Sequence, residues 1–262
     1  MTTAGSGVTI HLVLTANDKD GFSVPYGPCE QLKEVARLLE AGADVAGVGS
    51  SGRFEDVRAA VEKCGRRFLG ITVDLSRMAS IGQIVSRTRE HFGRIDILVN
   101  NAGIIRRTPC IDFSEKDWDE VMDVNLKAAF FLAQAVARVF LEQGTGGKII
   151  NIASMLSFQG GILIPSYTAS KSGLAGITRT MANEWAAKGI NVNAIAPGYM
   201  ITRATEALQK DPVRSRAILD RIPAGRWGRP SDVGGMAVFL ASAASDYCHG
   251  GVYPVDGGWL AR

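Results

Sequence analysis

The sequence predicts one doubly wound α/β domain, in which helices cover both faces of a mostly parallel sheet of seven strands. Three observations lead to this fold class. With 262 residues, 46% of them hydrophobic, the chain can bury a large core. Strand-like and helix-like segments alternate along its length, which favours parallel strands joined by helical crossovers. No linker, low-complexity tract or internal repeat divides residues 1–262, so a single domain is expected.

Seven apolar runs rich in β-branched residues predict the strands. They span residues 8–14, 44–48, 68–73, 95–99, 148–153, 190–196 and 252–255. Helical patterns lie between them, because apolar side chains recur there every three or four residues. One such face comprises Ile81, Ile84, Val85, Thr88 and Phe92. A longer face runs from Trp118 to Val139, and residues 167–188 are predicted to form one further long helix.

The composition argues against several classes of protein. The net charge is +3, with acidic and basic residues interspersed, so no nucleic-acid-binding surface is expected. The four cysteines and three histidines lack the spacing of metal ligands or disulfides, which indicates a reducing compartment and no metal site. Apolar runs are too short to cross a bilayer, and no signal-peptide pattern is present. We therefore expect a cytoplasmic protein that binds no membrane.

Tyr167 and Lys171 are spaced to act together. Positions i and i+4 share one face of a helix, so the phenol and the ammonium are expected one turn apart. A free phenol has a pKa of about 10 and stays protonated at neutral pH. A neighbouring cation would lower this pKa and make tyrosine a general acid or base. Ser154, at the end of an apolar run, would hold a substrate oxygen against the phenol.

Other candidate residues directly follow predicted strands. These are Asp74, the run Asn100-Asn101-Ala102-Gly103, Ser154, and Pro197-Gly198. Ligands of doubly wound sheets bind beyond the carboxyl ends of the strands, so these residues predict one binding rim. For Gly103 or Gly198 taken singly, the alternative is that the glycine merely ends a strand.

Several motifs occur together: Asn100-Asn101-Ala102-Gly103, Asn125, Ser154, Tyr167 with Lys171, Pro197-Gly198 with Thr202, and Asp256-Gly257-Gly258. On these motifs the sequence after about Glu34 resembles the short-chain dehydrogenase/reductase family, whose members are Rossmann-like oxidoreductases. Closer still, it resembles the branch that oxidises 2-dehydro-3-deoxy-D-gluconate at C5 with NAD in pectin and uronate catabolism. Residues 105–107, 113–118, 152–161, 222–228 and 257–262 carry this second resemblance.

The resemblance implies reversible hydride transfer between a nicotinamide and a carbinol or ketone carbon. Tyr167 would exchange the hydroxyl proton while Ser154 hydrogen-bonds the same oxygen. Lys171 would lower the Tyr167 pKa and bind the nicotinamide ribose. Asn125 would hold a water that links Lys171 to solvent, or would be a structurally satisfied core residue. The implied contacts to the dinucleotide come from Asp74, Leu75, Asn101, Ala102, Gly103, Tyr167, Lys171, Pro197, Gly198 and Thr202.

The segment 15–33 departs from the family. Relatives have there a glycine-rich turn whose backbone N–H groups bind the pyrophosphate. This segment does not reproduce the turn, and its prolines and aspartates would hinder anion binding. Three explanations are open: the turn has diverged and binds the dinucleotide weakly or not at all, it binds by another backbone route, or the stretch reflects a reading-frame error. The first explanation predicts weaker NADH binding than in relatives.

The sequence specifies the cofactor and the substrate less closely than it specifies the fold and the catalytic residues. The end of the second strand has no carboxylate to select NAD, and Arg53 could accept a 2′-phosphate or face solvent. NAD is expected because the similar enzymes use it, with NADP open. Arg106 and Arg107 could bind a sugar-acid carboxylate, or could be surface or subunit-contact charges. Gln159 could bind substrate hydroxyls, and residues 200–222 are expected to form the lid.

The expected substrate is thus a small sugar acid, and the similar proteins imply a homotetramer paired through the two long helices. Oxidation of gluconate at C5 and reduction of a 3-oxoacyl group remain alternatives. A non-catalytic scaffold with impaired dinucleotide binding is the alternative from another class. The joint presence of Asn125, Ser154, Tyr167 and Lys171 argues against that scaffold, because a purely structural role does not need all four.

Overall fold

The computed structural model describes residues 10–15, 42–202 and 205–262. They form a seven-stranded sheet in the order β3-β2-β1-β4-β5-β6-β7, with every neighbouring pair parallel, so the predicted doubly wound sheet is confirmed. The strands are β1 (Ile10–Thr15), β2 (Ala43–Gly49), β3 (Phe68–Thr72), β4 (Ile97–Asn100), β5 (Gly147–Ile152), β6 (Ile190–Pro197) and β7 (Val252–Val255). Each overlaps one of the predicted apolar runs.

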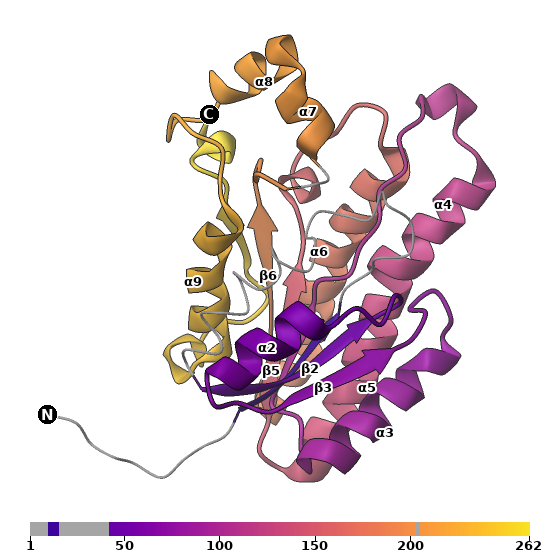
Figure 1. Ribbon diagram of the computed structural model, residues 1–262, viewed down its shortest axis with the longest axis vertical. Helices are drawn as coiled ribbons and strands as arrows, with labels where there is room; N and C mark the ends of the chain where they lie inside the picture. The colour runs from indigo at the N-terminus through magenta and orange to yellow at the C-terminus, as the bar shows by residue number, and fades with distance from the viewer. Residues whose placement is uncertain (1–9, 16–41, 203–204) are drawn as a thin grey trace, which may run out of the picture.

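Helices cover both faces of the sheet, as Figure 1 shows. On one face, α3 (Ala79–Phe92), α5 (Ala128–Gln143) and α6 (Pro165–Trp185) pack their apolar side chains against the strands. On the other face, α2 (Glu55–Lys63) and α9 (Pro230–Ala241) do the same. The helices therefore leave the carboxyl edge of the sheet as the place where loops can form a site.

The strands supply side chains to both apolar layers. Leu98 of β4 points into the layer under α5, whereas its neighbours Ile97 and Val99 point into the layer under α9. Successive side chains of a strand leave opposite faces, so a strand covered on both sides must be apolar throughout. This is why the strands appear in the sequence as continuous apolar runs rather than as alternating ones.

One helical run contains an irregular turn at a candidate residue. α4 (Glu115–Met122) passes through a π-helical turn at Asp123–Lys127 directly into α5. Ser114 caps the start by accepting a hydrogen bond from the Asp117 N–H at 3.1 Å. A π turn widens the helix by one residue and is often found at functional sites. Here it contains Asn125.

This run also bears on the membrane prediction. By length and composition, Glu115–Gln143 could cross a bilayer, contrary to the expectation that no apolar run is long enough. That expectation considered only uninterrupted apolar stretches, whereas this helix is apolar on average. Yet 56% of the most apolar 18-residue stretch of this helix is buried inside the protein, where α5 forms part of the core. A helix buried in a protein core can have the same length and hydropathy as one that crosses a membrane.

Shorter elements complete the chain. α6 covers the predicted long helix and ends in a 3₁₀ turn at Ala186–Lys188. Beyond β6 lie α7 (Glu206–Lys210) and α8 (Pro212–Leu219), within the expected lid segment. Further 3₁₀ turns in the described ranges include Cys110–Asp112, Met155–Ser157, Ala243–Ser245 and Trp259–Ala261.

The α8 region has a hydrophobic cluster of its own. Buried Ile218, Ile222, Trp227 and Trp259 pack there with Met155 and Leu156, the two residues that follow Ser154. This third cluster therefore joins the lid segment and the carboxyl-terminal turn to the end of β5.

Only Thr15 of the segment 15–33 falls within the described residues, and it ends β1. β1 pairs with β2 on one side and with β4 on the other. The three explanations for the missing glycine-rich turn, and the expected weaker NADH binding, concern residues outside the described ranges and stay predictions.

Candidate active site

Ser154 lies just beyond β5, where the chain enters the 3₁₀ turn Met155–Ser157. Its extended backbone lets Oγ accept a hydrogen bond from the Leu156 N–H at 3.2 Å, which caps that turn. The side chain is buried, and its hydroxyl proton can still be donated. Ser154 is thereby fixed as a donor at the carboxyl edge of the sheet.

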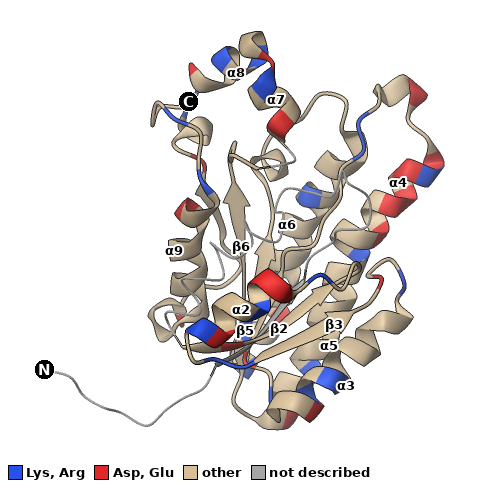
Figure 2. Cartoon of the chain, viewed as in Figure 1, with Lys and Arg blue, Asp and Glu red and all other residues tan. Residues whose placement is uncertain are grey.

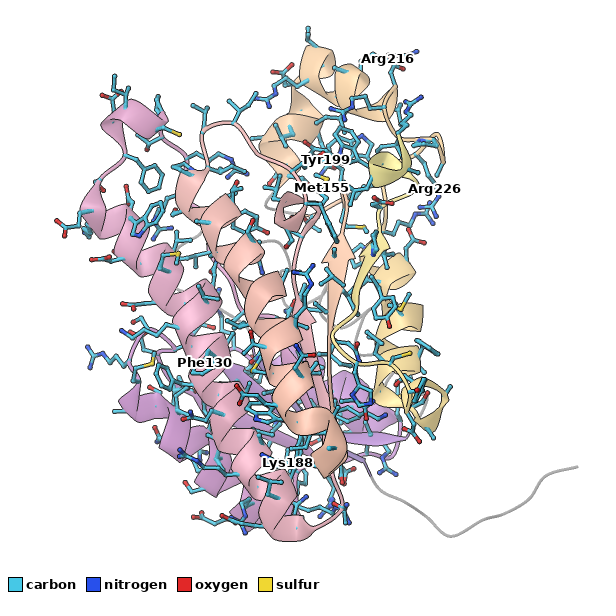
Figure 3. All side chains as sticks on the ribbon, turned by 180° about the vertical axis from the view of Figure 1, so that it is seen from behind. Phe130, Met155, Lys188, Tyr199, Arg216 and Arg226 are labelled. Atoms are coloured by element: carbon cyan, nitrogen blue, oxygen red, sulfur yellow. The ribbon has the colours of Figure 1, made fainter. Side chains whose placement is uncertain are left out.

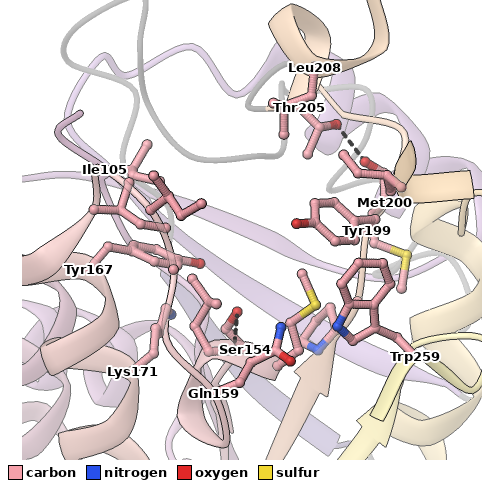
Figure 4. Close-up of a pocket in the computed structure, with 18 of the residues that line it drawn as sticks. Ile105, Ser154, Gln159, Tyr167, Lys171, Tyr199, Met200, Thr205, Leu208 and Trp259 are labelled. Atoms are coloured by element: carbon pink, nitrogen blue, oxygen red, sulfur yellow. Dashed lines mark hydrogen bonds between the residues drawn. The ribbon is translucent and has the colours of Figure 1, made fainter. Parts of the chain in front are cut away.

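α6 carries Tyr167 and Lys171 one turn apart, as their spacing predicts. Both side chains line the same cavity as Ser154, and Figure 4 shows the three together. The Lys171 ammonium lies 5.7 Å from the centroid of the Tyr167 ring. It donates a hydrogen bond to the Ile152 carbonyl at 2.5 Å, which fixes the lysine to the end of β5.

Burial, rather than the neighbouring lysine, dominates the acidity of Tyr167. Burial raises the pKa of Tyr167 to about 12, while the Ser154 hydrogen bond and the Arg107 charge oppose it only in part. Burial also lowers the pKa of Lys171 to about 8. The prediction that Lys171 lowers the Tyr167 pKa below its ordinary value is wrong for this structure, because removal from water disfavours the charged form of both groups.

Asn125 is held entirely by protein groups. Its Oδ1 accepts from the Ile104 N–H at 2.7 Å, and its Nδ2 donates to the Ile104 carbonyl at 2.9 Å and to Ser170 Oγ at 3.2 Å. The amide thus links the loop after β4 to the π turn before α5 and to α6. These contacts favour the alternative of a satisfied core asparagine, and the water-holding role stays a prediction.

We expect Asn125→Ala to lower the free energy of unfolding by about 2–4 kcal/mol, because two buried backbone groups of Ile104 lose their partners. Ser170→Ala is the graded control, since it removes the Asn125 contact and the hydrogen bond from Ser170 Oγ to the Tyr167 carbonyl but leaves Ile104 paired. Urea titrations of the two variants measure the difference. Equal unfolding midpoints would show that this link contributes little.

Two predicted glycines lie against other parts of the site. A Cβ at Gly103 would come within 3.3 Å of Asn125 Oδ1 and 3.7 Å of Lys171 Nζ. A Cβ at Gly198 would come within 2.6 Å of the Asp256 Cα. Both positions therefore require close packing, and Gly198 does more than end a strand.

The remaining cofactor candidates lie apart from the cavity. Asp74, beyond β3, accepts hydrogen bonds from the backbone N–H and the hydroxyl of Ser76. Leu75 is buried in the core layer under α5, and Ala102 packs against the same layer. Arg53 lies beyond β2, where its N–H donates to Ser51 Oγ at 3.2 Å.

A cavity of about 480 Å³ joins most of the candidates. Its lining includes Asn101, Arg107, Ser154, Gln159, Tyr167, Lys171, Pro197, Gly198 and Thr202. Among the described lining residues there are four basic side chains, those of Arg107, Lys171, Arg214 and Arg221, and no Asp or Glu. Electrostatically, such a cavity suits an anion.

The two adjacent arginines have different surroundings. Arg106 does not line the cavity; its guanidinium lies 2.8 Å from Glu120 and 3.5 Å from Asp117 on α4. The prediction that Arg106 binds a substrate carboxylate is therefore wrong, because Glu120 and Asp117 already pair with its guanidinium. Arg107 does line the cavity, where burial lowers its pKa.

Sequence reasoning missed part of the lining. Tyr199 and Trp259 line the cavity, and their rings meet edge to face with centroids 4.8 Å apart. On α8, Val213, Arg214, Ala217 and Ile218 line it as well. Their spacing marks one helix face and was a usable signal, but the packing of α8 near the turn after β5 depends on the tertiary fold.

Comparison with known proteins extends these findings. The family model for enoyl-(acyl carrier protein) reductase matches residues 33–260. The 2-dehydro-3-deoxy-D-gluconate 5-dehydrogenase of Escherichia coli K12 is 60% identical over 225 residues, covering 86% of this chain and 88% of the relative. The protein of the same description in Bacillus subtilis 168 is 52% identical over 225 residues, with the same coverage.

A solved structure of a similar protein has the same fold. A gluconate 5-dehydrogenase from Burkholderia cenocepacia, in complex with NADP and tartrate, superimposes with a TM-score of 0.85 at 36% identity, covering 97% of this chain and 96% of the other. The family-model match begins at residue 33, close to Glu34, where the resemblance was expected to start.

Proposed function

This chain belongs to the short-chain dehydrogenase/reductase family of oxidoreductases, and from this membership we propose that it oxidises 2-dehydro-3-deoxy-D-gluconate at C5 with a nicotinamide dinucleotide. The observation that carries the proposal is the cavity in which Ser154, Tyr167 and Lys171 adjoin Arg107, with no carboxylate in its described lining. A substrate with a hydroxyl group to oxidise suits the first three residues, and a negative charge on the same molecule suits Arg107 and the lack of carboxylates. The 60% identity to the Escherichia coli enzyme supports the choice of sugar acid.

Each side chain has a task in the proposed reaction. Ser154 hydrogen-bonds the C5 oxygen, and Tyr167, in its phenolate form, takes the hydroxyl proton as the C5–H bond breaks and the C=O bond forms. A bound nicotinamide dinucleotide would accept the hydride. In the reverse direction Tyr167 returns the proton, and its pKa of about 12 keeps it protonated for that step. With a pKa of about 8, Lys171 releases a proton near neutral pH more readily than an ordinary lysine.

The residues along the rim fit a dinucleotide. Pro197, Gly198 and Thr202 line the same cavity as Lys171, which supports contacts to the nicotinamide half, and Asn101, expected on the adenosine side, lines it as well. A Cβ at Gly103 would lie only 3.3 Å from Asn125 Oδ1, which supports a close approach of the backbone there. We keep NAD as the expected cofactor and NADP as the alternative, since the Burkholderia relative was crystallised with NADP.

A spectrophotometric panel tests the function directly. Nicotinamide absorbance is followed with 2-dehydro-3-deoxy-D-gluconate, gluconate and a 3-oxoacyl thioester, each with NAD(H) and with NADP(H). We expect the first substrate to give the highest kcat/KM. A preference for gluconate or for the thioester would reject the assignment, and no turnover with any substrate would support the non-catalytic scaffold.

We also propose that the chain is one domain that acts in the cytoplasm as a homotetramer. Trp118, Phe131 and Leu141 on α4 and α5 are 40%, 39% and 49% exposed. Apolar surface of this kind on the two helices supports pairing with another copy. Light scattering that gives a monomer would contradict the tetramer.

A further inference from the structure

α8 presents one particular face to the cavity. Val213, Arg214, Ala217 and Ile218 line it, and Arg221 in the following turn continues that face. Arg216 belongs to the other side of the helix. Its guanidinium lies 2.9 Å from Asp220 and its side chain is 74% exposed, and Figure 3 shows it at the outer surface. Of the two arginines on α8, only Arg214 faces the cavity.

A second arginine reaches the same cavity from another element. Arg107 follows β4, and its charge acts on Tyr167. The charge of Arg214 in turn acts on Arg107 and, with that of Arg221, on Tyr199. The Arg107 and Arg214 guanidiniums therefore lie within electrostatic reach of one another, and Arg107 also lies within reach of the Tyr167 phenol.

Like charges in a partly dry cavity repel each other, and burial adds to the cost. Burial is the larger cause that lowers the Arg107 pKa, and Arg214 adds to it. The described lining offers no carboxylate, and an anion bound in the cavity would attract both guanidiniums. Figure 2 shows basic residues on α8 above the sheet, whereas α4 carries mainly acidic ones.

We propose that Arg214 is a substrate-binding residue that, together with Arg107, binds the carboxylate of the sugar acid. Two planar guanidiniums from separate elements suit a carboxylate, which accepts paired N–H donors. Ser154, Gln159 and Tyr199 remain for the hydroxyl groups of the same molecule. The bound anion then links α8 to the loop after β4. The identity of the anion rests on the proposed function, whereas the arginine pair can be tested separately.

Calorimetric titration of the full-length protein tests the pair. D-Gluconate and D-glucitol share a six-carbon polyol chain and differ in the carboxylate. Both are titrated with reduced nicotinamide dinucleotide present, because an alcohol and a reduced cofactor cannot react. We expect wild type to bind gluconate more tightly than glucitol. Arg214→Ala and Arg107→Ala should each weaken gluconate binding roughly tenfold to a hundredfold and leave glucitol binding unchanged.

Controls separate charge recognition from folding. Arg216→Ala, on the outer side of α8, should bind gluconate as wild type does, and Arg214→Lys should restore part of the affinity. The double variant should lose less than the product of the single losses, because both arginines hold one carboxylate.

Three results would overturn the proposal: wild type that binds gluconate no more tightly than glucitol, an Arg214→Ala variant that binds like Arg216→Ala, or equal losses for both ligands. A wild-type protein that fails to oxidise 2-dehydro-3-deoxy-D-gluconate, yet binds gluconate through Arg214, would reject the proposed function and leave the arginine pair in place.

Discussion

Tyr167→Phe is expected to lower kcat by about two to four orders of magnitude and to leave the fold intact. The substitution removes only the hydroxyl that exchanges the proton. The ring remains packed beside Ile104, Val121 and Val124. Turnover is measured from the nicotinamide absorbance with the best substrate of the panel, and circular dichroism reports folding.

Tyr247→Phe is the matched control, because Tyr247 is fully exposed at 100% and lies far from the site in sequence. It makes the same chemical change and should keep wild-type turnover. If Tyr167→Phe retained more than about a tenth of wild-type kcat, another group would have to move the proton, since general acid–base catalysis is worth at least about a hundredfold.

Lys171→Met is expected to abolish turnover while it removes a cost to stability. Burial lowers the folded-state pKa of Lys171 from 10.5 to about 8. Between these values the unfolded chain holds more protons than the folded one, so wild-type stability rises with pH across this window. Below pH 8 the buried charge costs about 3 kcal/mol relative to the neutral amine, at about 1.4 kcal/mol per pH unit.

The measurement is the difference in unfolding free energy between Lys171→Met and wild type at several pH values. The advantage of the variant should shrink by about 3 kcal/mol from pH 7 to 10.5. Titration of Tyr167 occurs in both proteins and largely cancels. Lys188→Met, which removes an exposed ammonium after the same helix, should show no such trend. A flat difference for Lys171→Met would mean that water reaches its ammonium.

The fold was predictable because its pattern is local. Strands covered on both sides must be apolar throughout, and a phenol and an ammonium at i and i+4 must share a helix face. The acidity of Tyr167 was not predictable, because spacing indicates proximity but says nothing about removal from water. Likewise, spacing could not separate Arg106 from Arg107: which of two adjacent side chains meets α4 depends on how the loop packs.

Arg214 and Trp259 were missed for a related reason. Their segments lie well beyond Tyr167 in the chain and meet the turn after β5 only through tertiary packing. Asn125 showed a different difficulty. A polar residue on an apolar helix face suggested function, yet two of its three hydrogen bonds are to backbone groups of Ile104, which no side-chain pattern can reveal.

The separate cluster under α8 has a consequence for enzyme engineering. Ile218, Ile222 and Trp227 anchor this part of the molecule without sharing the two apolar layers that hold the sheet together. The segment around α8 can therefore be exchanged between homologues, or varied in a library, with little loss of stability in the sheet and its covering helices. Natural selection has the same freedom, so new substrate ranges should arise here sooner than in the strands.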